Sequence, residues 1–192
     1  NCRTFSSAQA QYQQRSMDFP YGDDNRSLGP FRDSVVQDSK IAVRVATLCK
    51  IHHALGDAFS IEHCWPTAML QFESFQELLR MPGVFVLTWD NCEFGEEYKH
   101  RQVLVTNMPW LAALARDCQG GHVHLEIGFG KDLTTTDVSA YAWGCCTEYA
   151  KLTGAFVRSP ADNKCVHCLP QGKSDNIFRR RETLRRCAER VQ

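Results

Sequence analysis

The sequence predicts one α/β domain built on an open, mostly parallel sheet flanked by helices, followed by a basic helical tail. Stretches with helical periodicity alternate with short apolar stretches along most of the chain. The segment "GVFVLTWD" (83–90) is continuously apolar, which is typical of a strand buried on both faces of a parallel sheet. With 192 residues, 43% hydrophobic and 23% charged, the chain is long enough for one domain with a proper core.

The first half of the predicted domain begins with a long polar loop over residues 1–33, rich in turn-forming residues. Asp33 or Ser34 can cap a helix whose apolar residues recur until Leu55, and Gly56 ends it. A short strand is expected at 58–61. It runs into a turn within "FSIEHCWPTAML" (59–70), at the mouth of the sheet where ligands bind in open α/β folds.

The next elements follow in the same alternating order. A helix is expected at 74–81, ended by Pro82-Gly83, and the apolar strand 83–90 follows it.

The second half of the domain continues the alternation. "RQVLVTN" (101–107) and "HVHLEI" (122–127) read as strands, and "MPWLAALARDC" (108–118) reads as a helix with proline in its first turn. A last helix is expected over 137–154, capped by Thr135 or Thr136.

The composition changes at residue 158, where we place the boundary between the domain (1–157) and a linker with a basic helix (158–192). Residues 158–192 carry nine Lys/Arg and four Asp/Glu, a net charge of +5, so the rest of this neutral chain carries −5. The basic helix has only a thin apolar stripe, which suits docking on a surface better than packing in a core. The tail can therefore pair with the acidic body or with an anionic partner.

Ten cysteines are many for a chain of this size. Several fall inside expected helices and strands, as buried thiols do, so we favour a reducing intracellular compartment and metal binding by a subset; an oxidising compartment stays open. No apolar run approaches the roughly 18 to 20 residues of a membrane span. The chain opens on Asn1 rather than methionine, so we expect its true start to lie elsewhere.

Two groups of residues have the chemistry of zinc ligands. Cys118, His122 and His124 lie together in "CQGGHVH", and Cys92 follows the strand 83–90, whose end could bring it to them. Two thiolates and two imidazoles suit tetrahedral zinc. A second candidate is the pair Cys165 and Cys168 in "CVHC", which supplies half a site, with Cys145, Cys146 or Cys187 as completions.

Four segments in order resemble the cytosine-C5 DNA methyltransferases, in particular the divergent viral and retroelement-borne forms. They are "NCRTFSSA", "FSIEHCWPTAML", "WDNCEFGEEYKHRQVLVTN" and "CQGGHVH", and the resemblance covers about residues 1–150. It implies a Rossmann-like sheet and two catalytic residues. Cys2 occupies the place of the nucleophile that attacks C6 of a flipped-out cytosine, and Glu62 that of the carboxylate that holds the ring.

The chain departs from the family's pattern at important places. Asn1 replaces the proline before the nucleophile, and the family's Glu-Asn-Pro reads Glu62-His63-Cys64. The glycine-rich loop that binds S-adenosylmethionine precedes the nucleophile in the family, and nothing here corresponds to it. We therefore do not expect this chain alone to bind S-adenosylmethionine.

The sequence leads to three hypotheses about function. The first is a catalytically inactive, methyltransferase-like module that acts as a structural or binding component of a larger assembly. The second is a fragment of an active DNA cytosine-C5 methyltransferase, and the third is a zinc-stabilised interaction module. Other protein subunits are the expected partners. Nucleic acid is the alternative, through the arginines of the tail: Arg179, Arg180, Arg181, Arg185 and Arg186.

Overall fold

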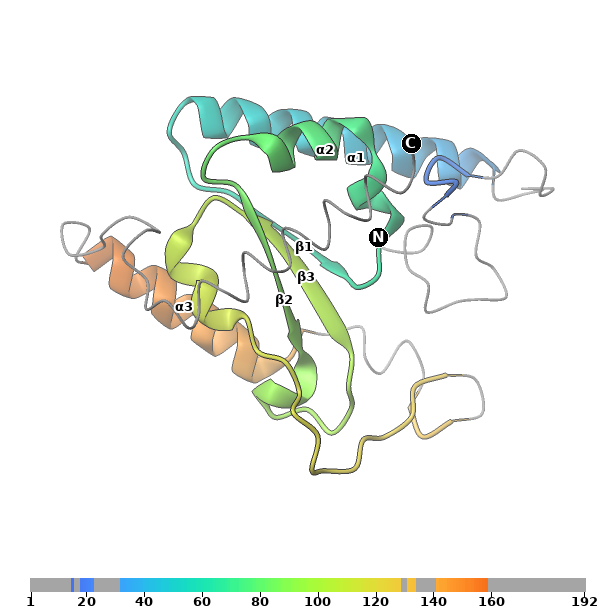
Figure 1. The fold of residues 1–192 in the computed structure, drawn as a ribbon, viewed down its shortest axis with the longest axis vertical. Helices are drawn as coiled ribbons and strands as arrows, with labels where there is room; N and C mark the ends of the chain where they lie inside the picture. The colour runs from blue at the N-terminus through green and yellow to red at the C-terminus, as the bar shows by residue number, and fades with distance from the viewer. Residues whose placement is uncertain (1–14, 16–17, 23–31, 129–130, 134–140, 159–192) are drawn as a thin grey trace.

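A computed structural model describes residues 15, 18–22, 32–128, 131–133 and 141–158 of the chain. In it, a three-stranded sheet lies between two layers of helices (Figure 1). The helices α1 (Arg32–Ala54) and α2 (Glu73–Arg80) cover one face of the sheet. The helix α3 (Trp143–Arg158) and the 3₁₀ helix η5 (Pro109–Leu114) cover the other face.

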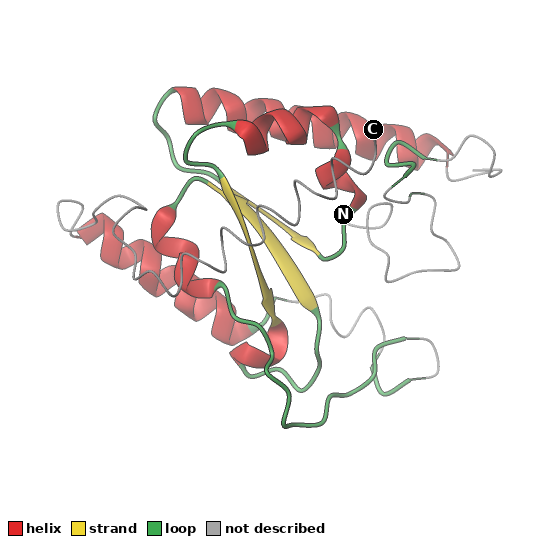
Figure 2. Cartoon of the chain, viewed as in Figure 1, coloured by secondary structure: helices red, strands yellow, loops and turns green. Residues whose placement is uncertain are grey.

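The sheet is antiparallel, and its central strand is the last of the three in the sequence. The strands are β1 (Ser60–Cys64), β2 (Phe85–Asp90) and β3 (Arg101–Thr106), in the spatial order β1-β3-β2. β3 pairs antiparallel with both neighbours, so that Leu104 lies opposite Glu62 on one side and Leu87 on the other. Figure 2 shows these strands in yellow between the helical layers.

The prediction of an open, mostly parallel, Rossmann-like sheet is wrong. The crossover through α2 does leave β1 and β2 pointing the same way, as the alternation of elements suggested, but β3 inserts between them in the opposite direction. Residues 91–100, which join β2 to β3, contain only the 3₁₀ helix η4 (Asn91–Phe94). Parallel neighbours need a crossover of about a dozen residues or more, so this connection allows only an antiparallel pair.

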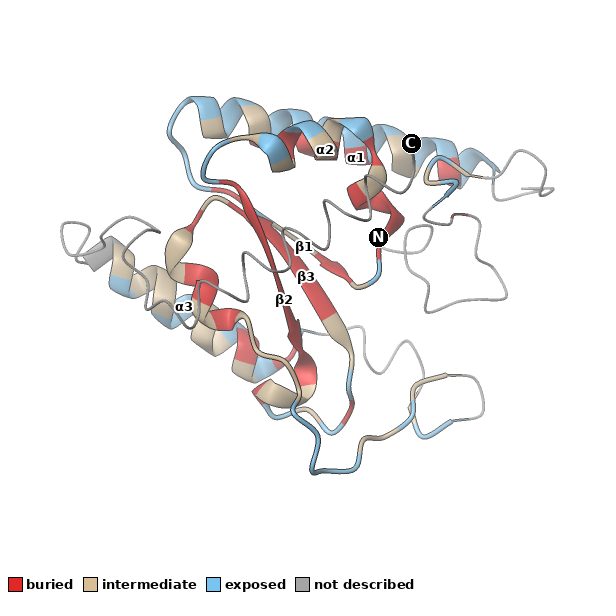
Figure 3. Cartoon of the chain, viewed as in Figure 1, coloured by how far each residue is buried: buried red, intermediate tan, exposed pale blue. Residues whose placement is uncertain are grey.

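Two apolar clusters, one on each face of the sheet, form the core. Phe72, Phe75 and Leu78 pack with Val103 and Val105 on the α1/α2 face. On the α3 face the cluster consists mainly of Phe85, Leu87, Trp89, Leu104, Leu111 and Leu114. Every residue of β2 is buried (Figure 3), which is why its sequence does not alternate between apolar and polar residues. The prediction that the strand at 83–90 is buried on both faces is thus confirmed, but such burial does not determine the direction of a strand.

The long helices agree with the sequence in position. α1 buries Val35, Ala42, Ala46 and Cys49 at helical spacing, the last three of them in the core, and α2 matches the helix expected at 74–81. The helix expected over 137–154 begins only at Trp143 and extends to Arg158; residues 134–140 lie outside the described part.

Three shorter elements differ from the prediction. The expected strand 58–61 lies further along the chain, as β1. The expected helix 108–118 is reduced to the 3₁₀ helix η5, and the expected strand 122–127 does not form. There, Leu125 and Ile127 each make one isolated bridge, and Val123 is 93% exposed. Leu125 and Ile127 are only partly buried, and single bridges do not give the segment "HVHLEI" a neighbouring strand along its length.

Within the described ranges, no helix is long and apolar enough to cross a membrane. The long loop expected at residues 1–33 lies mostly outside the description, and the basic helix of the tail lies wholly outside it.

Candidate metal centre

The four residues of the first zinc candidate converge. The ligand atoms of Cys92, Cys118, His122 and His124 all lie within 4.8 Å of one another. The Sγ atom of Cys118 is 3.8 Å from Nε2 of His122 and 3.5 Å from Nε2 of His124. This group can hold a metal ion, and the part of the chain that the structure describes contains no other such group of three or more ligands.

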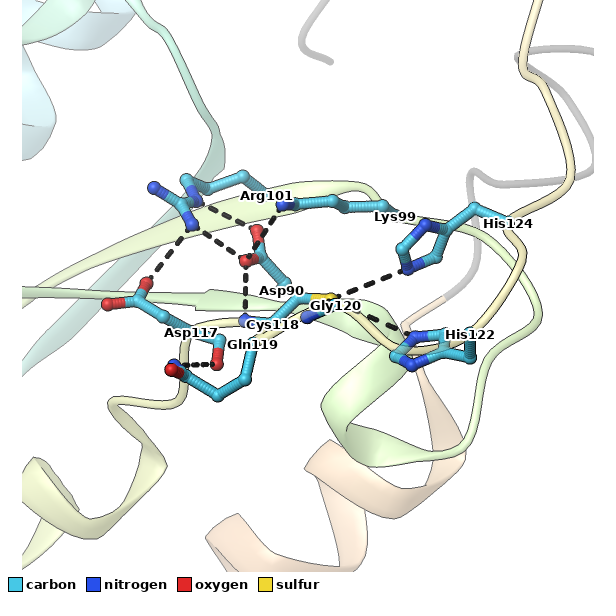
Figure 4. A network of polar contacts seen from close by, with 9 residues as sticks. All are labelled: Asp90, Lys99, Arg101, Asp117, Cys118, Gln119, Gly120, His122 and His124. Atoms are coloured by element: carbon cyan, nitrogen blue, oxygen red, sulfur yellow. Dashed lines mark hydrogen bonds and ion pairs between the residues drawn. The ribbon is translucent and has the colours of Figure 1, made fainter.

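The centre joins two segments that are distant in sequence. Cys92 lies in η4, directly after β2, and the other three ligands lie in the loop that follows η5. Gly120 and Gly121 have φ values of +81° and +87°, a conformation that glycine adopts without strain. This double left-handed turn reverses the loop, so that His122 and His124 return to Cys118 (Figure 4).

Two separations between ligand atoms are close to those of a tetrahedral site. With Zn–S bonds of about 2.3 Å and Zn–N bonds of about 2.0–2.1 Å, tetrahedral angles place sulfur about 3.5–3.6 Å from nitrogen. The two sulfur–nitrogen distances from Cys118, 3.5 Å and 3.8 Å, are close to this value. A small adjustment of side chains would therefore complete the coordination.

A buried carboxylate fixes the backbone on which the centre is built. Asp90 is 0% exposed, at the end of β2 and two residues before Cys92. Arg101 donates to both of its oxygens, from Nε at 2.8 Å and from Nη2 at 2.7 Å. The backbone N–H of Cys118 donates to the same carboxylate at 2.9 Å, so Asp90 ties the loop to the strand end (Figure 4).

Further contacts secure both ends of the loop. The backbone N–H of Asp90 donates to the carbonyl of Arg116, and Asp117 accepts from Arg101 at 3.1 Å. Beyond the histidines, the N–H of Leu125 donates to the carbonyl of Glu97 at 2.9 Å. The loop is thus held before and after its three ligands by contacts within the protein.

Two acidic groups at the centre, Asp90 and Cys92, have shifted pKa values. Burial works to raise the pKa of Asp90, but the hydrogen bonds from Arg101 and from the Cys118 backbone, with the charges of Arg101 and Lys99, outweigh it. The pKa of Asp90 is therefore below its usual value, and the group is ionised at neutral pH. Burial and the neighbouring Cys118 raise the pKa of the Cys92 thiol to about 11.

The other predicted site residues are not brought to this centre. Glu62, His63 and Cys64 lie within β1 rather than in a turn, so they do not form one cluster at a strand mouth. Glu62 lies opposite Leu104 on the α3 face, whereas His63 lies opposite Val103 on the α1/α2 face. Cys2, Cys165 and Cys168 lie outside the described residues.

The role of Asp90 and Arg101 was missed in the sequence. They are cross-strand partners in the β2–β3 pair, and opposite charges at such positions attract. The signal was present in the acid that ends a buried strand and the arginine that begins the next one. These two residues are expected to meet only if the strands pair antiparallel, because in a parallel sheet the end of one strand lies far from the start of its neighbour.

The fold and the site together define a three-stranded antiparallel sheet between helices, with a candidate centre of two cysteines and two histidines. Comparison of the chain with protein-family models, with curated proteins and with solved structures gives no match. The resemblance to cytosine-C5 methyltransferases therefore rests on the short sequence motifs alone.

Proposed function

We propose that this chain is a zinc-stabilised binding module without catalytic activity, in which one Zn²⁺ joins Cys92 to the loop of Cys118, His122 and His124. The observation that carries the proposal is the convergence of the four ligand atoms within 4.8 Å. Thiolate is a soft ligand and imidazole a borderline one, and both favour zinc over calcium or magnesium, which prefer oxygen.

The donor set favours a structural role for the ion. Four protein ligands close the tetrahedral shell, whereas catalytic zinc sites keep one position for water or substrate. Because the loop buries little apolar surface, a metal would supply much of the free energy that orders it. The raised pKa of Cys92 is compatible with this role, since a bound cation favours the thiolate that coordinates it.

The enzyme alternative, an active methyltransferase fragment, has no specific observation in its favour. The sheet is a small antiparallel one, and the position that corresponds to the nucleophile, Cys2, lies outside the described residues. Glu62 alone does not define a reaction.

Metal analysis of the purified full chain tests the proposal. Prepared without chelators, the protein should carry about one zinc per molecule. Cys118→Ala and His124→Ala should each lose most of it. Cys146→Ala is the matched control, because Cys146 is an exposed thiol on α3 that does not belong to the four-residue group, and it should keep the metal.

Two results would contradict the proposal. One is a metal-free wild-type protein that does not take up zinc when it is supplied. The other is zinc that survives Cys118→Ala but is lost in Cys165→Ala, which would assign the metal to the other cysteine pair.

For the partner, we propose a protein surface, contacted by the arginine-rich tail. The support is in the sequence: a segment with charge +5 follows a body with charge −5, and no groove-reading motif accompanies the arginines. Deleting residues 175–192 should weaken association with co-purifying proteins. A steep, salt-dependent affinity for duplex DNA that disappears with the deletion, while protein contacts persist, would favour nucleic acid instead.

A further inference from the structure

The outer side of α1 carries large aliphatic side chains, although much of this helix is exposed (Figure 3). Ile41 and Leu48 are each 55% exposed, Ile51 is 50% exposed, and Leu55, directly after the helix, is 72% exposed. Over the described residues, α1 and Leu55 together carry more than half of the large hydrophobic side chains that are exposed. Single exposed apolar residues are ordinary, but a group of them on one element marks an interaction surface.

Four of these side chains form one stripe along the helix, which we call the outer stripe: Ile41, Leu48, Ile51 and Leu55. Leu48 and Leu55 follow Ile41 at intervals of seven residues, and Ile51 lies one turn after Leu48. The N–H of Leu55 donates to the carbonyl of Ile51 at 3.0 Å, so helical hydrogen bonding continues to the end of the stripe. This spacing is that of the seam along which two helices pair.

The outer stripe is distinct from the face of α1 that packs in the core. Ala42, Ala46 and Cys49 belong to the apolar cluster on the α1/α2 face of the sheet. Ile51 lies two and a half helical turns after Ala42, so it points away from that cluster. A helix on the surface of a domain needs only one apolar face, and the second face of α1 is therefore not explained by the fold of this chain.

Two exposed cations lie beside the outer stripe. Lys40 directly precedes Ile41, and Arg44 lies about one turn from both Ile41 and Leu48. No acid occurs in residues 39–56. In the part of the chain that the structure describes, neither Lys40 nor Arg44 forms an ion pair.

The acids that contact the second half of α1 are paired with other residues. Glu77 of α2 pairs with Lys50, and Asp57 pairs with His52. The outer stripe is therefore an apolar surface with a positive charge that the described residues do not neutralise.

This charge distinguishes between the possible occupants of the stripe. A second copy of the chain would add its own Lys40 and Arg44 to a face without acids, and segment 158–192 carries a net charge of +5. An anionic membrane would match the charge, but helices that lie in a membrane surface typically carry Trp or Phe, and α1 has no aromatic residue of that kind. The seven-residue spacing favours a helix, and the charge favours an acidic one.

We propose that the outer stripe of α1 binds an acidic amphipathic helix of another protein. Apolar side chains of that helix pack on Leu48 and Leu55, and its carboxylates pair with Lys40 and Arg44. The proposal goes beyond the zinc centre and the docking of the tail, because it uses no residue of either.

Fluorescence anisotropy of a labelled peptide, titrated with the full chain, tests this. The probe is a peptide of about three heptads, with leucine at the two seam positions, glutamate at the positions beside them and alanine elsewhere. The control peptide has lysine in place of every glutamate. We expect the acidic peptide to bind with a Kd of about 10–100 μM and the basic one at least about tenfold more weakly.

Two variants locate the binding on α1. Leu48→Gln removes apolar surface at an exposed position and keeps a good helix former, so affinity should fall about tenfold while Tm stays the same. Arg44→Glu should reverse the preference, so that the basic peptide binds better than the acidic one.

The matched control variants are Trp143→Gln and Lys151→Glu. Both positions are exposed, and both lie on α3, on the other side of the sheet. Each should bind the acidic peptide as the wild type does.

The proposal is overturned if the acidic peptide does not bind at about 0.5 mM protein, fivefold above the weakest Kd expected. It is also overturned if the basic peptide binds as well, or if either variant on α1 binds both peptides as the wild type does. Zinc content measured on the same samples separates these outcomes from a failure of the metal centre.

Two further measurements would assign the stripe to another occupant and so overturn the proposal. One is sedimentation of the chain with phosphatidylserine-containing vesicles that is lost in Leu48→Gln, which would indicate a membrane surface. The other is a dimer in analytical ultracentrifugation that Leu48→Gln dissociates, which would indicate a second copy.

Discussion

Asp90 is the residue on which both parts of the metal centre depend. It precedes Cys92 by two positions, accepts two hydrogen bonds from Arg101, and accepts the backbone N–H of Cys118. Buried charges are tolerated when they are paired and fully hydrogen-bonded, as this one is. The carboxylate therefore positions two sulfur ligands without touching a metal, the role that groups around the ligands play in metal sites generally.

Asp90→Asn should weaken both the fold and the centre. The substitution keeps the size of the side chain but leaves Arg101 without its buried counter-charge, so unfolding free energy should fall by about 2 kcal/mol. Zinc affinity should fall about tenfold or more. Denaturant titration with and without EDTA, and competition with a zinc chelator, measure the two effects.

The control for this prediction is Glu77→Gln, which removes the exposed Lys50–Glu77 ion pair and should leave both quantities nearly unchanged. Wild-type stability and zinc affinity in Asp90→Asn would show that Asp90 does not position the loop.

At the scale of elements, the close approach of α3 to η4 supports the segment that carries Cys92. A Cβ atom at Gly144 would lie 2.2 Å from the carbonyl oxygen of Phe94, far inside contact distance. The obstacle is backbone, which cannot swing aside as a flexible side chain does. Gly144 is thus required by packing, not by its own conformation.

Gly144→Ala should therefore destabilise the protein by about 1–3 kcal/mol, because α3 must move away from η4. A glycine in an open helical position would behave in the opposite way, since alanine there stabilises by about 1 kcal/mol. The sign of the change in the free energy of unfolding, measured by thermal or denaturant titration, therefore shows whether packing requires glycine at position 144. Lys151→Ala, at an exposed position of the same helix, should have little effect.

At the scale of the whole molecule, the sheet and its two helical layers form the stable body, and the metal loop is attached to one end of it. Both faces of β2 and β3 are covered, so apolar side chains of these strands pack on both sides of the sheet. The loop of Cys118, His122 and His124 has no such core, and its order depends on Asp90 and on the proposed ion.

This division explains what the sequence could predict. Helices α1 and α2 and strand β2 follow from apolar periodicity and from their stop signals, which are local. The convergence of Cys92 with Cys118, His122 and His124 could also be predicted, because only a few residue types bind zinc and these four suit one tetrahedral site. Strand direction did not follow, since burial alone does not encode it.

The rest could not be predicted because it depends on pairing between distant segments. The Asp90–Arg101 contact requires the antiparallel register of β2 and β3. A cavity lined by residues of β1, β2, β3 and α3 likewise requires elements that are distant in the sequence to meet.

X-ray absorption at the zinc edge of the purified, zinc-loaded chain tests the central claim most directly. A centre formed by Cys92, Cys118, His122 and His124 predicts a first shell of two sulfur atoms at about 2.3 Å and two nitrogen atoms at about 2.0–2.1 Å. Cys118→Ala should remove one sulfur or the whole signal. A shell of nitrogen and oxygen alone, or one unchanged by Cys118→Ala, would contradict the account.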